Sequence, residues 1–211
     1  EKNPYLNLFV YDIILFFTFL LPHEKDYYGI KLLLKNNRKN IFLDIGANNG
    51  MSTRGFRKLG FENPIYIFEP NKYLCIKYLQ PITKKILNLK LFDFGLGNED
   101  KKLEVFTPFL GKKSLHFMAS YSKQYILDSV NVVSKNYHKK IKLKKSKFKI
   151  KKFDNLKIDK KIDFIKMDIE GYEHEAIKGM KKTIQKNKPI FLIEFNYQNF
   201  KKVFNLLNDY N

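Results

Sequence analysis

A segment with two glycines, DIGANNG at positions 44–50, is the first part of the chain whose residue types suggest chemistry. It follows an apolar run that is typical of a buried strand, and it precedes a pattern that is typical of a helix. Glycines let the backbone turn sharply and approach a ligand closely. The first N–H groups of the following helix favour a bound anion. An ordinary strand–turn–helix connection would have the same pattern, so the segment alone does not identify a ligand.

A carboxylate, Glu69, ends the next predicted strand. An acidic residue at this point can accept hydrogen bonds from the hydroxyls of a ribose. The spacing at 44–50 is D-x-G-x-x-x-G rather than G-x-G-x-x-G, which disfavours a nicotinamide cofactor and favours S-adenosyl-L-methionine. The cofactor-binding residues that we expect are Asp44, Gly46, Ala47, Asn48, Asn49, Gly50, Glu69, Pro70, Asn71, Gly95 and Asp168.

Acidic residues also follow two later strands of the predicted sheet. In the sequence KMDIEGYE at 166–173, Asp168 and Glu170 come after a buried strand, and Glu194 ends the next one. Together with His174, they are the candidates for a catalytic group that takes a proton from an acceptor. His174 could equally be a partly exposed helix residue. Glu173 suits the first turn of its helix, which is a structural role.

A divalent metal held by Asp168, Glu194 and Asn196 is an alternative use of the same region, because hard oxygen ligands converge there. Carboxylates in a cleft more often serve as acid–base or binding groups. We therefore expect no metal.

Short apolar runs that alternate with helical patterns must position these side chains. They predict an α/β fold of the Rossmann-like class, with a mostly parallel central sheet and helices on both faces. Ligands bind beyond the carboxyl ends of such strands, where the candidate residues fall. Residues 95–98 are expected as a turn, and the Lys-rich segment 139–152 as an edge strand with a solvated basic face. The other predicted strands are 41–45, 64–69, 86–94, 103–107, 162–168 and 189–195, and the predicted helices are 25–36, 51–59, 71–80, 172–186 and 199–207.

The apolar stretch at 8–21 is expected to be a helix of an N-terminal extension, residues 1–38, that packs on the domain. Its 14 residues are fewer than the roughly 20 that cross a bilayer, and its flanks do not suit a signal peptide. Peripheral contact with a membrane or a partner is the alternative. The single cysteine, Cys75, excludes a disulfide framework within the chain and favours a reducing, cytoplasmic compartment.

Four segments together resemble the FkbM methyltransferase family: FLDIGANNG (42–50), IFEPN (67–71), IDFIKMDIEGYEHEAIKGM (162–180) and KPIFLIEFN (188–196). The resemblance implies a class I methyltransferase domain over 39–211. It also implies methyl transfer from S-adenosyl-L-methionine to a hydroxyl of a sugar, glycan or small natural product. The family fold normally adds two strands after the one at 189–195. Only 15 residues follow Asn196, and their pattern is helical, so the final hairpin is expected to be truncated or absent.

The formal net charge of +19 leaves a second function open. Such an excess attracts anionic partners, including nucleic acid. However, Lys supplies 37 of the 40 basic residues, whereas phosphate-binding surfaces favour Arg; an AT-rich coding sequence explains the excess more simply. A nucleic-acid methyltransferase would place 139–152 beside the cleft and bind in a salt-dependent way. A non-catalytic binding module is the third alternative.

Overall fold

The computed structural model describes residues 25–33, 40–133, 140–194 and 199–210. The predicted helix at 8–21 and the candidate metal ligand Asn196 lie outside these ranges. No helix within the described ranges combines the length and the apolar character needed to cross a membrane.

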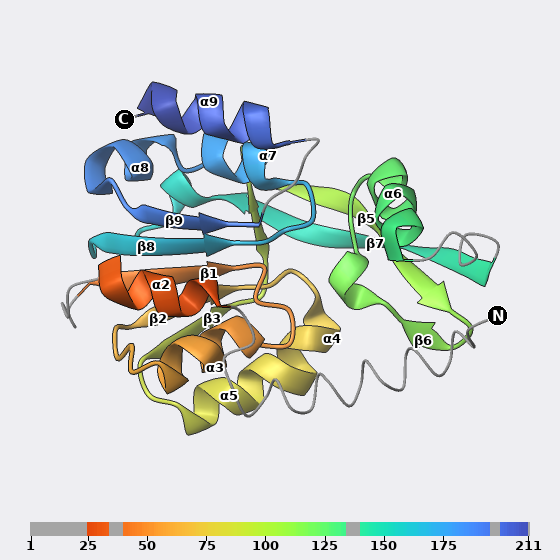
Figure 1. The fold of residues 1–211 in the computed structure, drawn as a ribbon, viewed down its shortest axis with the longest axis horizontal. Coiled ribbons are helices and arrows are strands. Elements are labelled where there is room, and N and C mark those ends of the chain that lie inside the picture. The colour runs from red at the N-terminus through yellow and green to blue at the C-terminus, as the bar shows by residue number, and fades with distance from the viewer. Residues whose placement is uncertain (1–24, 34–39, 134–139, 195–198, 211) are drawn as a thin grey trace.

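A five-stranded parallel sheet forms the centre of the molecule (Figure 1), with the strand order β3-β2-β1-β8-β9. The first strand, β1, lies in the middle of this sheet. Strands β2 and β3 follow on one side of β1, and β8 and β9 are added on its other side. The carboxyl ends of β1 and β8 therefore form the switch point at which α/β sheets bind ligands. Each strand falls within its predicted range: β1 (Ile41–Ile45), β2 (Ile65–Phe68), β3 (Leu89–Phe92), β8 (Ile162–Met167) and β9 (Ile190–Ile193).

Helices cover both faces of the central sheet, as the alternation of strands and helices predicts. Successive residues of β1 point to opposite faces, so that Phe42 packs with Phe56 and Phe164, while Leu43 packs in a cluster with Ile177. The first face carries α2 (Asp26–Leu33), α3 (Met51–Lys58), α4 (Lys72–Leu74), a π-helical turn (Cys75–Leu79) and α5 (Gln80–Lys85). The second face carries α7 (Glu173–Lys178), α8 (Lys181–Asn187) and α9 (Phe200–Tyr210).

A second sheet forms a lobe beside the central one (Figure 1), with the strand order β4-β7-β5-β6. Helix α6 packs against this lobe through a small apolar cluster that includes Leu110, Leu115 and Ile126. The elements of the lobe are β4 (Gly95–Gly97), β5 (Lys101–Leu110), β6 (Lys113–Ser114), a 3-10 turn (His116–Met118), α6 (Lys123–Val133), β7 (Ile141–Lys152) and a second 3-10 turn (Phe153–Asn155).

Three of the predictions for the residues of the lobe need correction. Residues 95–97 were expected in a turn but form β4, because their backbone pairs with residues 150–152. The short strand expected at 103–107 is the middle of the longer β5. The Lys-rich segment is not an edge strand throughout, since the end of β7 lies between β4 and β5. Its basic face is solvated as predicted, because Lys145, Lys147 and Lys149 are exposed.

The helix predicted over 172–186 is interrupted at Gly179 and Met180, so it forms two helices, α7 and α8. The interruption brings Gly179 against β4. A Cβ atom added to Gly179 would lie 1.9 Å from the carbonyl oxygen of Gly97. The N–H of Asp154 also donates to the carbonyl of Gly179 at 3.0 Å. The break therefore lets the lobe sit directly on the helical layer of the central domain.

The variant Gly179→Ala should lower the free energy of unfolding by about 3 kcal/mol, because the added methyl group overlaps backbone that cannot move aside easily. Chemical denaturation would measure this loss. The matched control is Gly29→Ala in α2, where an added Cβ meets nothing within 4 Å. That control should be neutral or stabilising by up to about 1 kcal/mol. Equal stability of the two variants would contradict the close contact.

Candidate functional site

A cavity of about 380 Å³ lies at the carboxyl ends of the central strands, between them and the lobe. One part of its wall comes from the loop after β1, the end of β2 and the segments after β8 and β9. The other part comes from the lobe. Most of the predicted site residues line it: Gly46, Ala47, Asn48, Asn49, Glu69, Pro70, Asn71, Gly95, Asp168, Glu170 and Glu194.

The loop after β1 has an unusual backbone. Gly46 and Gly50 have φ values of 77° and 81°, and Asn48 has a φ of 52°, so three residues in five are left-handed. Gly46 is needed for a second reason as well. A Cβ atom at this position would lie 1.9 Å from the carbonyl oxygen of Asp168. The loop can therefore pass close to the end of β8 only with glycine at position 46.

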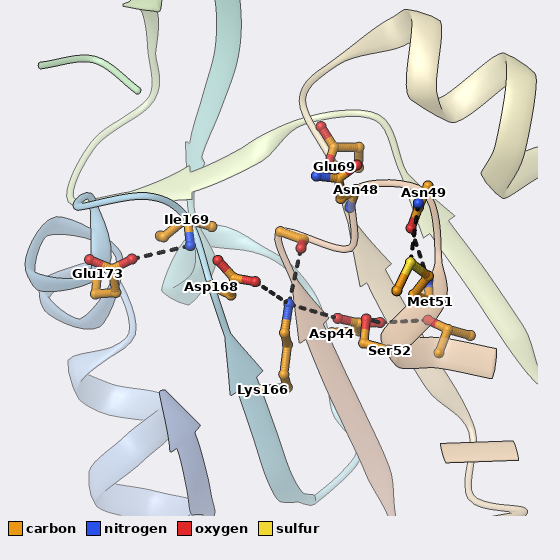
Figure 2. Close-up of polar contacts among 12 residues, drawn as sticks. Asp44, Asn48, Asn49, Met51, Ser52, Glu69, Lys166, Asp168, Ile169 and Glu173 are labelled. Carbon is orange, nitrogen blue, oxygen red and sulfur yellow. Dashed lines mark hydrogen bonds and ion pairs between the residues drawn. The ribbon is translucent and has the colours of Figure 1, made fainter. Parts of the chain in front are cut away.

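Glu69 joins this loop to the end of β2 (Figure 2). One of its carboxylate oxygens accepts the backbone N–H of Asn48 at 2.9 Å. The other oxygen accepts the N–H of Asn71, also at 2.9 Å. The residue is 6% exposed. Burial raises the pKa of Glu69 to about 7, although the two N–H groups and the charge of Lys166 oppose the rise. Each oxygen keeps a lone pair that can accept a further hydrogen bond from a ligand.

A buried lysine lies under the same loop (Figure 2). Nζ of Lys166 donates to the carbonyl of Gly46 at 3.1 Å and to Asp168 at 3.2 Å, and it lies 3.8 Å from Oδ1 of Asp44. The other carboxylate oxygen of Asp44 accepts hydrogen bonds from the hydroxyls of Ser52 and Thr53, each at 2.6 Å. One ammonium group thus connects β1, the glycine loop and the end of β8.

Two of the predicted cofactor-binding residues do not line the cavity. Asp44 is fully buried beneath the loop, and its hydrogen bonds tie the loop to the start of α3. Gly50 has a buried backbone packed near Leu79 and Ile82. Both residues shape the loop from behind rather than facing a ligand. Lys166 was absent from the predicted site residues, although it lies in the acidic motif that drew attention to Asp168.

Three carboxylates converge where the segments after β8 and β9 line the cavity. Oxygens of Asp168, Glu170 and Glu194 lie within 4.8 Å of one another. Burial and the neighbouring carboxylates raise the pKa of Glu170 to about 9, and burial and Asp168 raise that of Glu194 to about 8. Protons held here near neutral pH suit acid–base chemistry. The separation would also let one divalent cation bridge the three groups.

The lobe holds the acidic loop in place. The hydroxyl of Ser120 donates to the Glu170 carbonyl at 2.7 Å, and the Tyr125 side chain of α6 lies close enough to the Glu170 carboxyl group to lower its pKa. Glu170 has a φ of 52°, a value that non-glycine residues seldom adopt. Tertiary contacts from a segment about 50 residues earlier therefore stabilise its conformation.

The two candidates on helix α7 have different outcomes. His174 does not line the cavity and lies 3.1 Å from Glu175, so its position does not support a catalytic role. Glu173 has the structural role that was expected. Its carboxylate accepts the N–H groups of Ile169 and Gly171 at 3.1 and 3.2 Å.

The lobe supplies cavity-lining residues that the sequence did not identify. Lys113, Ser114, His116, Phe117, Ser120 and Tyr121 line its end of the cavity. Their segment has no glycine motif or strand-end carboxylate to mark it, and only the tertiary structure brings it to the site.

Strand β7 does lie beside the cavity, as the nucleic-acid alternative requires. However, its cavity-lining residues are Phe148 and Ile150. The exposed Lys147 and Lys149 alternate with these residues and therefore point to the opposite face of the strand. This basic face does not border the cavity.

The variant Lys166→Met should lower the free energy of unfolding by about 3 kcal/mol, because it leaves the buried Asp44 without its nearest cation. Urea denaturation would measure the change. Lys186→Met, at an exposed position of α8, is the matched control and should change stability by less than about 0.5 kcal/mol. A loss no larger than in the control would show that the buried ammonium is not needed.

The variant Glu170→Gln should become more stable relative to the wild type as pH rises. The fold raises the pKa of Glu170 from 4.5 to about 9. Between these two pH values, the Glu170 side chain is protonated in the folded chain but ionised in the unfolded chain. Wild-type stability therefore falls as pH rises between these values. The melting temperature of the variant, relative to wild type, should rise by several degrees from pH 5 to pH 9 in calorimetry.

Glu175→Gln is the control for this measurement. Although partial burial acts in the opposite direction, His174 and Lys178 lower the pKa of Glu175. Its ionised form is thus favoured by the fold, and the variant should gain no stability as pH rises. A pH-independent difference for Glu170→Gln would contradict the proposed protonation of this side chain.

Comparisons with known proteins agree on one family. The methyltransferase FkbM domain family matches residues 44–211. A crystal structure of methyltransferase FkbM from Methylobacillus flagellatus KT superposes with a TM-score of 0.56 at 19% sequence identity, over 85% of this chain and 39% of that one. The chain thus corresponds to about two fifths of that protein, and the likeness supports the mixed α/β fold with its parallel central sheet. A search of curated proteins found no match.

Proposed function

The chain belongs to the FkbM methyltransferase domain family, and from this premise we propose that it transfers the methyl group of S-adenosyl-L-methionine to a hydroxyl oxygen of a sugar, glycan or small natural product. One observation carries the proposal. The hydrogen bond from the N–H of Asn48 to Glu69 joins the glycine loop and the end of β2 on the rim of a single cavity.

The cavity has the groups that this cofactor requires at one end. The Glu69 carboxylate would accept the ribose hydroxyls, and the backbone of Gly46 to Asn49 would approach the methionine part. Asn48 supports this assignment, because its buried side-chain oxygen has no hydrogen-bond partner and Asn48 lines the cavity. The cofactor supplies a methyl group that is already activated on a sulfonium, so the chain mainly binds and orients the reactants.

The three carboxylates would act at the acceptor. Asp168 is held by the ammonium of Lys166, and the backbone of Glu170 is held by the hydroxyl of Ser120 in the lobe, so both residues have fixed positions at the cavity. A carboxylate here would take the proton that the acceptor hydroxyl loses as the oxygen gains the methyl group. Asp168 is the favoured group, because the ammonium of Lys166 holds its side chain in place at 3.2 Å beside the cavity. Glu170 and Glu194 would hold or donate protons nearby.

The alternatives receive less support from the same observations. A nucleic-acid substrate would use a basic surface at the cavity, whereas Lys147 and Lys149 face away from it. Peripheral membrane contact through residues 8–21 stays a prediction, because these residues lie outside the described ranges. We also propose a cytoplasmic location, because Cys75 is the only cysteine of the chain and is buried.

Calorimetry with S-adenosylmethionine and S-adenosylhomocysteine tests the proposal. The wild-type chain should bind both, and Glu69→Gln should weaken binding about ten- to hundredfold, because a hydrogen bond to a charged acceptor is lost. Glu99→Gln, at an exposed position, is the matched control and should bind like wild type. If the wild-type chain bound neither compound, the proposal would fail. A screen with labelled cofactor would then find which hydroxyl compounds accept the methyl group.

A further inference from the structure

The lobe end of the cavity differs in charge from the end formed by the central strands. Lys113 of β6 and His116 of the 3-10 turn both line it, together with the hydroxyl residue Ser114. In contrast, Asp168, Glu170 and Glu194 lie at the strand ends. The cavity therefore has an acidic end and an end with basic and hydroxyl donors.

A third basic group, Lys77 of the central domain, acts on His116 through its charge, although it does not line the cavity. Lys77, in the π-helical turn, and Lys113 both lie close enough to His116 for their charges to lower its pKa, in addition to the larger effect of burial. The ammonium of Lys77 is held in place, since it donates to the hydroxyl of Tyr73 at 2.8 Å and lies 5.0 Å from the ring centre of Tyr78. The charges of two lysines thus act on one partly buried imidazole.

We propose that the acceptor carries an anionic group, a phosphate or a carboxylate, which Lys113 and His116 bind at the lobe end of the cavity. The proposal rests on the methyltransferase function proposed above and narrows its substrate class. An acceptor bound in this way would place its anionic group at the lobe and its hydroxyl among the carboxylates of β8 and β9. The opposite charges of the two ends would fix its direction in the site.

The position of these groups favours a small anionic molecule over a polyanion. Lys113 and His116 line a cavity of about 380 Å³, a size that suits a small molecule or one terminal group. A nucleic acid or an anionic membrane would instead engage exposed lysines such as Lys145, Lys147 and Lys149. Those side chains lie on the face of β7 that does not border the cavity.

NMR of the His116 ring tests the proposal directly, with inorganic phosphate and acetate as probes in the full chain. Chloride keeps the ionic strength constant, and the spectrum of His116→Gln identifies the His116 signal. Phosphate or acetate should shift this signal in a saturable manner and raise the pKa of His116, because a bound anion offsets the two ammonium charges. The probe that acts at lower concentration distinguishes a phosphate site from a carboxylate site.

Two lysine variants separate a specific site from the general positive charge. Lys113→Gln should weaken the response to the anion by about tenfold or more, whereas Lys147→Gln, which removes an equal charge on the exposed face of β7, should respond like wild type. If neither anion moved the His116 signal beyond the chloride control, or if the two variants lost the response equally, the proposal would be wrong.

Calorimetry with S-adenosylhomocysteine on the same samples keeps this inference separate from the proposed function. Cofactor binding without an anion response at His116 overturns the anionic acceptor and leaves the methyltransferase proposal standing. An anion response in a chain that does not bind the cofactor overturns the methyltransferase proposal, and with it the assignment of the anion as part of a methyl acceptor.

Discussion

The ammonium of Lys166 is the contact on which the site depends. It is buried between Asp44, the carbonyl of Gly46 and Asp168, so it pairs with carboxylates from two neighbouring strands and donates a hydrogen bond to the glycine loop. A buried cation is costly unless carboxylates or carbonyls surround it. This requirement fixes the relative positions of the β1 and β8 ends, and thereby brings the glycine loop and Asp168 together at the rim of one cavity.

The central domain could be predicted from the sequence because its signals are local. The apolar run at 41–45 is buried along its whole length and therefore has no polar alternation to confuse its assignment. The glycines at 46 and 50 mark a turn that needs a left-handed backbone, and Glu69 is placed by the length of a single strand–helix–strand unit. The loop and Glu69 consequently lie on the same rim, as their spacing predicted.

The features that the sequence did not reveal depend on contacts between distant segments. Gly95 to Gly97 looked like a turn because two glycines around a single leucine carry no strand pattern, and only their pairing with the end of β7 makes them a strand. Gly179 interrupts a helical pattern for a reason that lies in β4. Similarly, His174 follows a promising motif, yet the helix directs it away from the cavity, and His116, in an unpromising segment, lines it.

The order of the strands divides the chain into a central domain and an inserted lobe. The main polypeptide path leaves the central sheet after β3 and rejoins it at β8, so the lobe is an insertion within a single turn of the Rossmann-like scaffold. The residues that hold Glu69 and the glycine loop lie outside this insertion, while much of the opposite cavity wall lies inside it. A different insertion at this point would therefore change much of the cavity wall while Glu69 and the glycine loop kept their places in the central sheet.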